Sequence, residues 1–166
     1  MGSIGSNNVY NAIHNFQQVS WEGITEVEKQ DLSRYIDSKP DVTSQISRGM
    51  VVPQSIIDEW TKTGSIQLND ISSWTQGNEG TAQRFADVPR QMDAEEGQRS
   101  VILMADNGLP NSASLPRTNA YDEHEVITKT NQLKIVDIQV KDNPYRTASG
   151  YRSYSPTITV IKVRRK

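Results

Sequence analysis

The sequence contains no cysteine, and this absence excludes several kinds of site at once. Thiol nucleophiles, disulfides and cysteine-ligated metals all require that side chain. Only two histidines are present, His14 and His124, which disfavours a histidine-based metal site and a serine–histidine catalytic triad. We therefore expect no metal centre in this protein.

Long apolar runs and a strong charge of one sign are also missing. No apolar stretch approaches the roughly 20 residues needed to cross a bilayer, so no membrane partner is expected. The net charge of −2 disfavours a general nucleic-acid binder. Residues 1–8 have neither the basic nor the apolar region of a signal peptide and resemble a tag or a loose terminus. We expect residues 9–166 to fold as a single domain.

The first third of the chain is predicted to be mainly helical. Apolar residues recur at helical spacing over residues 9–16. Thr25 and Glu28 have the spacing of a capping box, which indicates the start of a second helix. Pro53 suits the first position of a further helix, over residues 54–61.

The remaining apolar segments predict strands. Residues 66–75 indicate a strand that ends in hydroxyl residues, and Asn78 is a candidate cap for a short helix carrying Phe85. The segment from Asp106 to Tyr121 has no apolar pattern, and so long a structureless connection is more often functional than accidental. Other strands are expected over residues 51–52, 100–105, 126–127, 133–140 and 157–163.

Two glutamates flank His124 at the start of one predicted strand. Because side chains alternate along a strand, Glu123 and Glu125 are expected on one face and His124 on the other. The apolar residues that follow indicate that the strand runs into a core. The pair is therefore either a solvated acidic strand end or part of a site at the edge of a cleft.

Arg48 and Gly49 lie beside the first predicted strand. They are either a surface charge next to a turn or a guanidinium and a bare backbone placed against an anionic ligand. The residues alone leave both interpretations open.

Three separated motifs together resemble the arginine–serine–glutamate class of mono-ADP-ribosyltransferases, which includes bacterial toxins and phage-encoded transferases. The first motif is Ile46-Ser47-Arg48-Gly49-Met50. The second is Asp70-Ile71-Ser72-Ser73-Trp74-Thr75, followed by Ala82-Gln83-Arg84-Phe85-Ala86. The third is Glu123-His124-Glu125-Val126-Ile127, entered through a variable loop. The resemblance covers residues 20–163 and implies an α+β fold, with N-terminal helices packed on a split, mostly antiparallel two-sheet β core.

The middle motif departs from the family pattern. It reads Ser-Trp-Thr where the family has Ser-Thr-Ser, so the first serine is either Ser72 or Ser73. Ser73 is the better match because it shares a strand face with Thr75 and leaves Trp74 in the middle position.

The resemblance implies cleavage of the nicotinamide–ribose bond of NAD and transfer of ADP-ribose to a protein side chain. Glu125 would stabilise the positive charge that develops on the ribose. Ser73 would hold Glu125 in place, and Arg48 would bind the phosphates or the adjacent ribose. No metal is implied.

Further NAD contacts follow from the same resemblance. The Gly49 backbone would meet the nicotinamide amide, and Trp74 and Thr75 of the middle motif would line the same site. Phe85 would stack on nicotinamide, although a core aromatic on an amphipathic helix fits its spacing equally well.

Glu123 would serve the acceptor, because family members with glutamate at this position typically modify arginine. The loop from Asn107 to Tyr121 would recognise the target protein. The chain is expected to act in the cytoplasm of a bacterial host cell, as a phage-encoded or delivered effector, with secretion an open alternative.

Two other functions remain open from the sequence. An NAD glycohydrolase would use water in place of the protein acceptor, and a non-catalytic module would use the same fold to bind a partner. The presence of Arg48, Ser73 and Glu125 disfavours the second alternative.

Overall fold

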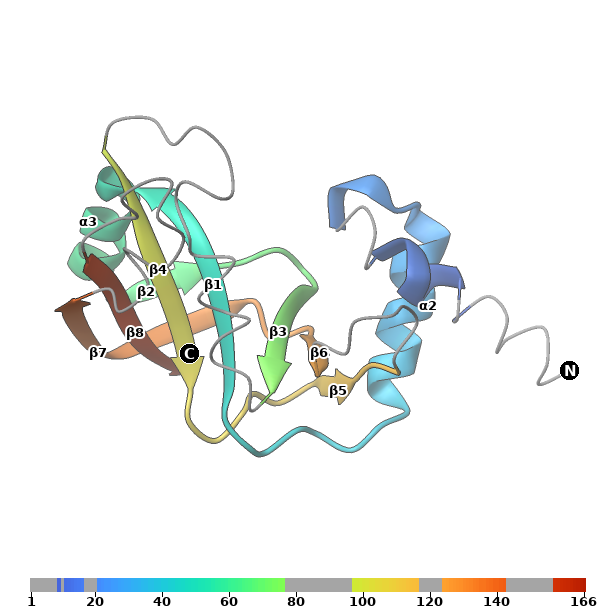
Figure 1. Cartoon of the computed structure of the whole chain (residues 1–166). Coiled ribbons are helices and arrows are strands. Elements are labelled where there is room, and N and C mark those ends of the chain that lie inside the picture. The colour runs from blue at the N-terminus through green and yellow to red at the C-terminus, as the bar shows by residue number, and fades with distance from the viewer. Residues whose placement is uncertain (1–8, 10, 17–20, 77–96, 117–123, 143–156) are drawn as a thin grey trace, which may run out of the picture.

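The computed structural model describes residues 9, 11–16, 21–76, 97–116, 124–142 and 157–166 (Figure 1). Its strands are β1 (Ile46–Pro53), β2 (Ser65–Gln67), β3 (Ser72–Gln76), β4 (Gln98–Ala105), β5 (Ser112–Ser114), β6 (Glu125–Thr128), β7 (Gln132–Asp142) and β8 (Thr157–Arg165). They join into one eight-stranded sheet in the order β2-β7-β8-β4-β1-β3-β6-β5. All neighbouring pairs are antiparallel except β4 and β8. The predicted α+β class is confirmed.

The helical elements described are residues 11–16, η1 (Trp21–Gly23), α2 (Glu26–Asp37) and α3 (Gln54–Thr63). The predicted capping box is confirmed, because the Thr25 hydroxyl accepts the Glu28 N–H and the Glu28 carboxylate accepts the Thr25 N–H. Pro53 was predicted at the first position of α3. It is instead the last residue of β1 and the N-cap of α3, with an extended ψ of 148°. No helix among the described residues is long and apolar enough to span a bilayer.

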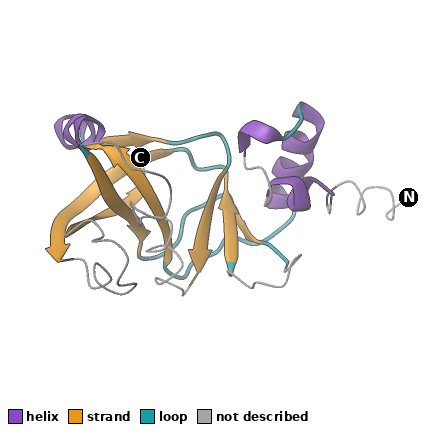
Figure 2. Cartoon of the chain, turned by 45° about the horizontal axis from the view of Figure 1, so that its top comes forward, coloured by secondary structure: helices purple, strands orange, loops and turns teal. Residues whose placement is uncertain are grey.

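The sheet is nearly divided in two beside β1. Strand β1 pairs with β4 along all of its length but with β3 only through Ile46↔Gln76 and Ser47↔Thr75. Beyond these pairs the strands part, and Figures 1 and 2 show β3, β6 and β5 as a separate group between the larger set of strands and the N-terminal helices. The expected two-sheet core is therefore one sheet with a split, joined by two residue pairs.

The two faces of β3 and β6 contact different hydrophobic cores. Trp74 and Val126, which pair across these strands, are buried in a core shared with β1, β4, β7 and β8. Ile127 and Ala113 are buried in a second core, against α2 and residues 11–16. Burial on both faces fixes the smaller group of strands, which carries two of the three motifs.

Several boundaries differ from those predicted. Residues 66–75 form two strands at separate places in the sheet, because the chain bends at Asp70-Ile71 between β2 and β3. The connection from Asp106 to Tyr121, predicted to be structureless, contains the edge strand β5. The helix predicted after Asn78 lies outside the described residues.

Strand β6 begins at Glu125, whereas the predicted alternation requires a strand that already includes Glu123 and His124. His124 has a φ of +49°, in the left-handed region, so a regular strand does not extend back through it. The prediction of a regular strand through His124 is therefore wrong. Glu123 itself lies outside the described residues.

Candidate active site

The split between β1 and β3 places Arg48 beside Ser73. Arg48 is the first residue of β1 after the last β1–β3 pair, and continuing that register would set Gly49 opposite Ser73. Because the strands part there, the Ser73 carbonyl has no β1 partner and instead accepts a hydrogen bond from Arg48 Nη1 at 2.7 Å. The guanidinium thus bridges the two strands where the backbone ladder stops.

The same serine contacts Glu125 through its side chain. Ser73 Oγ donates to Glu125 Oε2 at 2.6 Å, a diagonal contact between β3 and β6, since Glu125 itself pairs with Thr75. Hydrogen bonds from a hydroxyl to a carboxylate are short and stronger than neutral ones. One residue therefore joins the arginine and the glutamate of the motifs, through its backbone and its side chain respectively.

The structure separates the two candidate serines. Ser72 lies on the opposite strand face, is buried, and accepts a hydrogen bond from the Trp74 indole Nε1 at 2.9 Å. Ser73 is the serine that reaches Glu125. The Trp74 side chain is buried in the larger core and is not brought to the site, contrary to the expected NAD contact. Thr75 is buried between Ser47 and Glu125 on the same face as Ser73.

Arg48 carries a positive charge in a mostly desolvated position. Burial lowers the pKa of the Arg48 guanidinium, and the nearby charge of Glu125 opposes this shift. Its Nε is buried and has no hydrogen-bond partner in the part of the chain that the structure describes. A buried donor is normally satisfied, so this N–H suits an anionic ligand.

Backbone contacts hold Glu125 at the start of β6. The Gln76 N–H donates to the His124 carbonyl at 2.9 Å, and the Leu115 N–H donates to the Glu125 carbonyl at 2.9 Å. Glu125 is half-buried, and while these bonds hold the backbone at this end of the strand, Ser73 holds the carboxylate itself. Among the described residues no group of three or more histidine or acidic side chains is placed to bind a metal.

Comparisons with known proteins identify the fold. No protein-family model matches the sequence, and no curated protein matches it significantly. C3larvin toxin, an ADP-ribosyltransferase from Paenibacillus larvae, matches with a TM-score of 0.54 and 11% identity over 96% of this chain and 95% of that one. The Vis ADP-ribosyltransferase of Vibrio splendidus bound to an inhibitor matches with a TM-score of 0.53 and 16% identity over 82% of this chain. Vis bound to agmatine gives a TM-score of 0.51 and 14% identity over 96% of this chain.

The chain has the ADP-ribosyltransferase fold. It spans 55% and 67% of the two Vis structures. Within this fold the structure brings together Arg48, Ser73 and Glu125, with Gly49 next to Arg48 and paired with Ile102. Glu123, Phe85 and residues 117–121 of the predicted recognition loop lie outside the described residues.

Sequence reasoning missed the residues that hold Glu125 from outside the motifs. Gln76 and Leu115 act through backbone N–H groups, and Tyr35 of α2 contacts the neighbouring strand β5. Backbone donors carry no residue-type signature, and a tyrosine within a predicted helix does not indicate which strand it contacts. A sequence signal for these contacts is therefore lacking.

Proposed function

We propose that the protein is a mono-ADP-ribosyltransferase that cleaves NAD at the nicotinamide–ribose bond and transfers ADP-ribose to arginine in a target protein. The observation that carries the proposal is the linked group Arg48–Ser73–Glu125 in the split of an ADP-ribosyltransferase fold. A hydroxyl that orients a carboxylate, next to a buried guanidinium whose Nε has no partner among the described residues, suits a substrate that carries both a ribose and phosphates.

Glu125 is the proposed catalytic carboxylate. As the C–N bond breaks, its electron pair leaves with the nicotinamide ring nitrogen and the ribose carbon becomes cationic. A carboxylate held in advance beside that carbon stabilises the charge without having to reorganise. The 2.6 Å hydrogen bond from Ser73 supplies this fixed orientation.

Arg48 and Gly49 are the proposed NAD-binding residues on β1. The unpartnered Nε of Arg48 fits the diphosphate, because a guanidinium can pair with phosphate while Nη1 remains bonded to the Ser73 carbonyl. Gly49 lies where a bare backbone permits close approach of the nicotinamide amide. We also assign Phe85 to stacking on nicotinamide, on the family resemblance alone.

Glu123 is the residue proposed to serve the acceptor arginine. It would orient the incoming guanidinium and take the proton that this nitrogen loses when it bonds to the ribose carbon. Support comes from the complex of the structurally similar Vis with agmatine, a small molecule with the guanidinium group of arginine. We assign recognition of the target protein to the loop from Asn107 to Tyr121.

The test is incubation of the purified protein with NAD, alone or with agmatine, followed by chromatography of nicotinamide and ADP-ribosyl-agmatine. We expect release of nicotinamide and formation of the agmatine adduct, both lost in Glu125→Gln. Glu26→Gln, which changes an exposed carboxylate on α2, is the matched control and should retain both activities. Nicotinamide release without any adduct, with agmatine or with a bacterial lysate, would instead identify an NAD glycohydrolase. Absence of NAD cleavage would indicate a binding module.

A further inference from the structure

The start of strand β6, where Glu125 lies, depends on a very short neighbour. Strand β5 has three residues and is the outermost strand on that side of the sheet. The residue that directly follows β5, Leu115, donates its N–H to the Glu125 carbonyl at 2.9 Å. Short edge strands open readily, because their outer backbone groups lack a strand partner.

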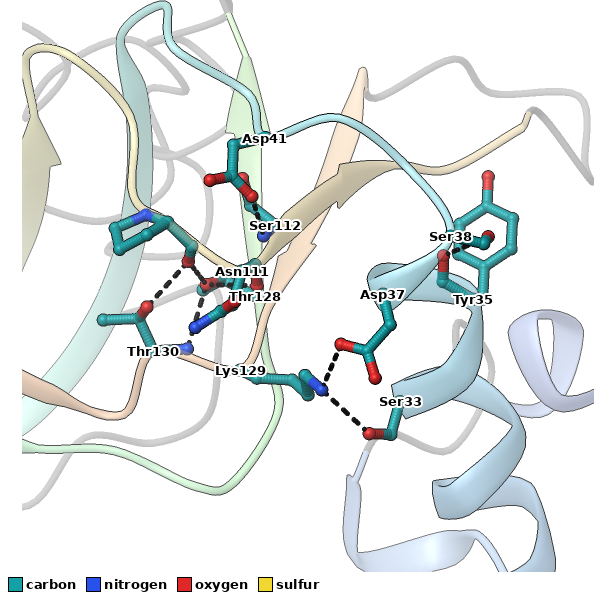
Figure 3. A network of polar contacts seen from close by, with 11 residues as sticks. Ser33, Tyr35, Asp37, Ser38, Asp41, Asn111, Ser112, Thr128, Lys129 and Thr130 are labelled. Carbon is teal, nitrogen blue, oxygen red and sulfur yellow. Dashed lines mark hydrogen bonds and ion pairs between the residues drawn. The ribbon is translucent and has the colours of Figure 1, made fainter.

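Side chains and a loop take the place of that missing strand. The Tyr35 hydroxyl of α2 donates to the Ser114 carbonyl at 2.9 Å, and the Val42 N–H donates to Ser112 Oγ at 2.8 Å. Figure 3 shows Tyr35 on helix α2 and Asp41, whose carboxylate accepts the Ser112 N–H, on the segment that follows this helix. Tyr35 binds at the end of β5 nearest Glu125, whereas the contacts of Ser112 lie at the far end.

We infer that Tyr35 is a positioning residue for Glu125, acting through the Ser114–Leu115 segment of the sheet edge. The inference rests on the proposed function, in which Glu125 stabilises the ribose cation. Releasing Ser114 would loosen Leu115 and therefore the Glu125 backbone, while Ser73 continues to hold one carboxylate oxygen. The predicted effect falls on the chemical step rather than on NAD binding, because Arg48 and Gly49, the proposed NAD-binding residues within the described part of the chain, lie on β1, across the split.

The surroundings of Tyr35 allow its hydroxyl to be removed without loss of packing. Its ring packs against the second hydrophobic core, and Lys39 Nζ lies 5.4 Å from the ring centre. Tyr35 and Ser114 also line an open cavity of about 480 Å³, together with Gln76. Tyr35→Phe therefore keeps the ring contacts and leaves room for water at the Ser114 carbonyl.

The experiment compares the kinetics of NAD cleavage in Tyr35→Phe and wild type at a temperature well below either Tm. We expect kcat to fall about fivefold to tenfold with the KM for NAD within about twofold, as for a misplaced catalytic group. Thr61→Val is the matched control, because it removes a 2.8 Å hydroxyl–carbonyl bond in α3, far from β5. It should leave both constants unchanged.

Hydrogen exchange supplies a second reading that does not depend on activity. In Tyr35→Phe the Leu115 amide should exchange faster, whereas the Lys129 amide, bonded to the Asn111 carbonyl at the other end of the β5–β6 pair, should stay protected. An unchanged Leu115 amide, an unchanged kcat, or a rise in KM alone would each overturn the inference. If wild type fails to cleave NAD, the proposed function fails by itself, and Leu115 exchange still decides whether Tyr35 holds this edge.

Discussion

The Ser73 hydroxyl donates a 2.6 Å hydrogen bond to the Glu125 carboxylate, and the backbone carbonyl of Ser73 accepts a hydrogen bond from Arg48. Two residues distant in the sequence, Arg48 on β1 and Glu125 on β6, thus meet at Ser73 on β3. The Arg48–Ser73 contact exists because β1 and β3 part after two residue pairs, which leaves the Ser73 carbonyl available to a side chain. The order of the motifs along the chain does not show this convergence.

The Ser73–Glu125 bond predicts a non-additive pair of substitutions. Glu125→Gln should lower kcat for nicotinamide release about 100-fold to 1000-fold, as for loss of a preorganised electrostatic group. Ser73→Ala should lower it about 10-fold, and the double variant should be no slower than Glu125→Gln, because Ser73 acts through Glu125. Steady-state kinetics of all four proteins test this. Multiplicative losses would contradict it, and Ser72→Ala, on the opposite face, should retain kcat.

Arg48 predicts an effect mainly on NAD affinity. Arg48→Lys should raise the KM for NAD about tenfold or more, because an ammonium cannot keep the Ser73 carbonyl contact and also present a second, planar donor to phosphate. Calorimetric titration with NAD measures the change directly. Arg34→Lys, an exposed arginine on α2, is the control. Equal NAD affinity in Arg48→Lys and wild type would remove Arg48 from the binding site.

The proposed roles of Glu123 and Glu125 predict that transfer to the acceptor and cleavage of NAD can be separated by substitution. Glu123→Gln should abolish transfer to agmatine, because the amide cannot accept the guanidinium proton, while nicotinamide release continues. The measurement is the ratio of ADP-ribosyl-agmatine to free ADP-ribose. Loss of both products together would assign Glu123 to the donor side instead.

Two glycines with the same backbone conformation predict different stabilities. Gly64 and Gly108 both have a φ of +71°, but a Cβ at Gly64 meets nothing within 4 Å, whereas one at Gly108 would lie 2.0 Å from the Val42 carbonyl oxygen. Gly64→Ala should cost about 1 kcal/mol for the left-handed conformation. Gly108→Ala should cost clearly more, since it also displaces the Val42 segment. Urea unfolding of both variants tests this, and equal costs would contradict the close approach.

The capping box of α2 predicts a pH-dependent loss of stability. The pKa of Glu28 is lowered, chiefly by the Thr25 backbone N–H and also by Asn15. Because the folded-state pKa lies below the ordinary value of 4.5, this contribution is present above about pH 4.5 and is lost as the pH falls below it. Glu28→Ala should therefore cost about 1 kcal/mol at pH 7 and less at pH 3.

Urea unfolding at the two pH values measures this difference. Gln30→Ala, at an exposed position of the same helix, should show no pH-dependent cost. If Glu28→Ala lowered the free energy of unfolding equally at pH 3 and pH 7, the charged Glu28 carboxylate would not be what stabilises the cap.

The sequence predicted the elements that local chemistry specifies. Thr25 and Glu28 interact within one helical turn. The apolar run at residues 100–105 forms most of the buried strand β4, whose strand character does not depend on which strands lie beside it. The resemblance selected the same arginine and glutamate that the fold brings together. Local patterns also misled: the alternation around His124 indicated a regular strand, which the positive φ of that residue interrupts.

By itself, therefore, the sequence determined the residue types of the candidate site and the order of its motifs. The sequence favoured Ser73 over Ser72, but only the tertiary structure showed that Ser73 reaches Glu125, because this contact depends on which strand face meets Glu125 and which meets the core around Trp74. The tertiary structure alone also showed that the Tyr35 hydroxyl binds the Ser114 carbonyl at the edge of the sheet. Such contacts join residues far apart in the chain, and strand pairing and burial rather than local propensity fix them.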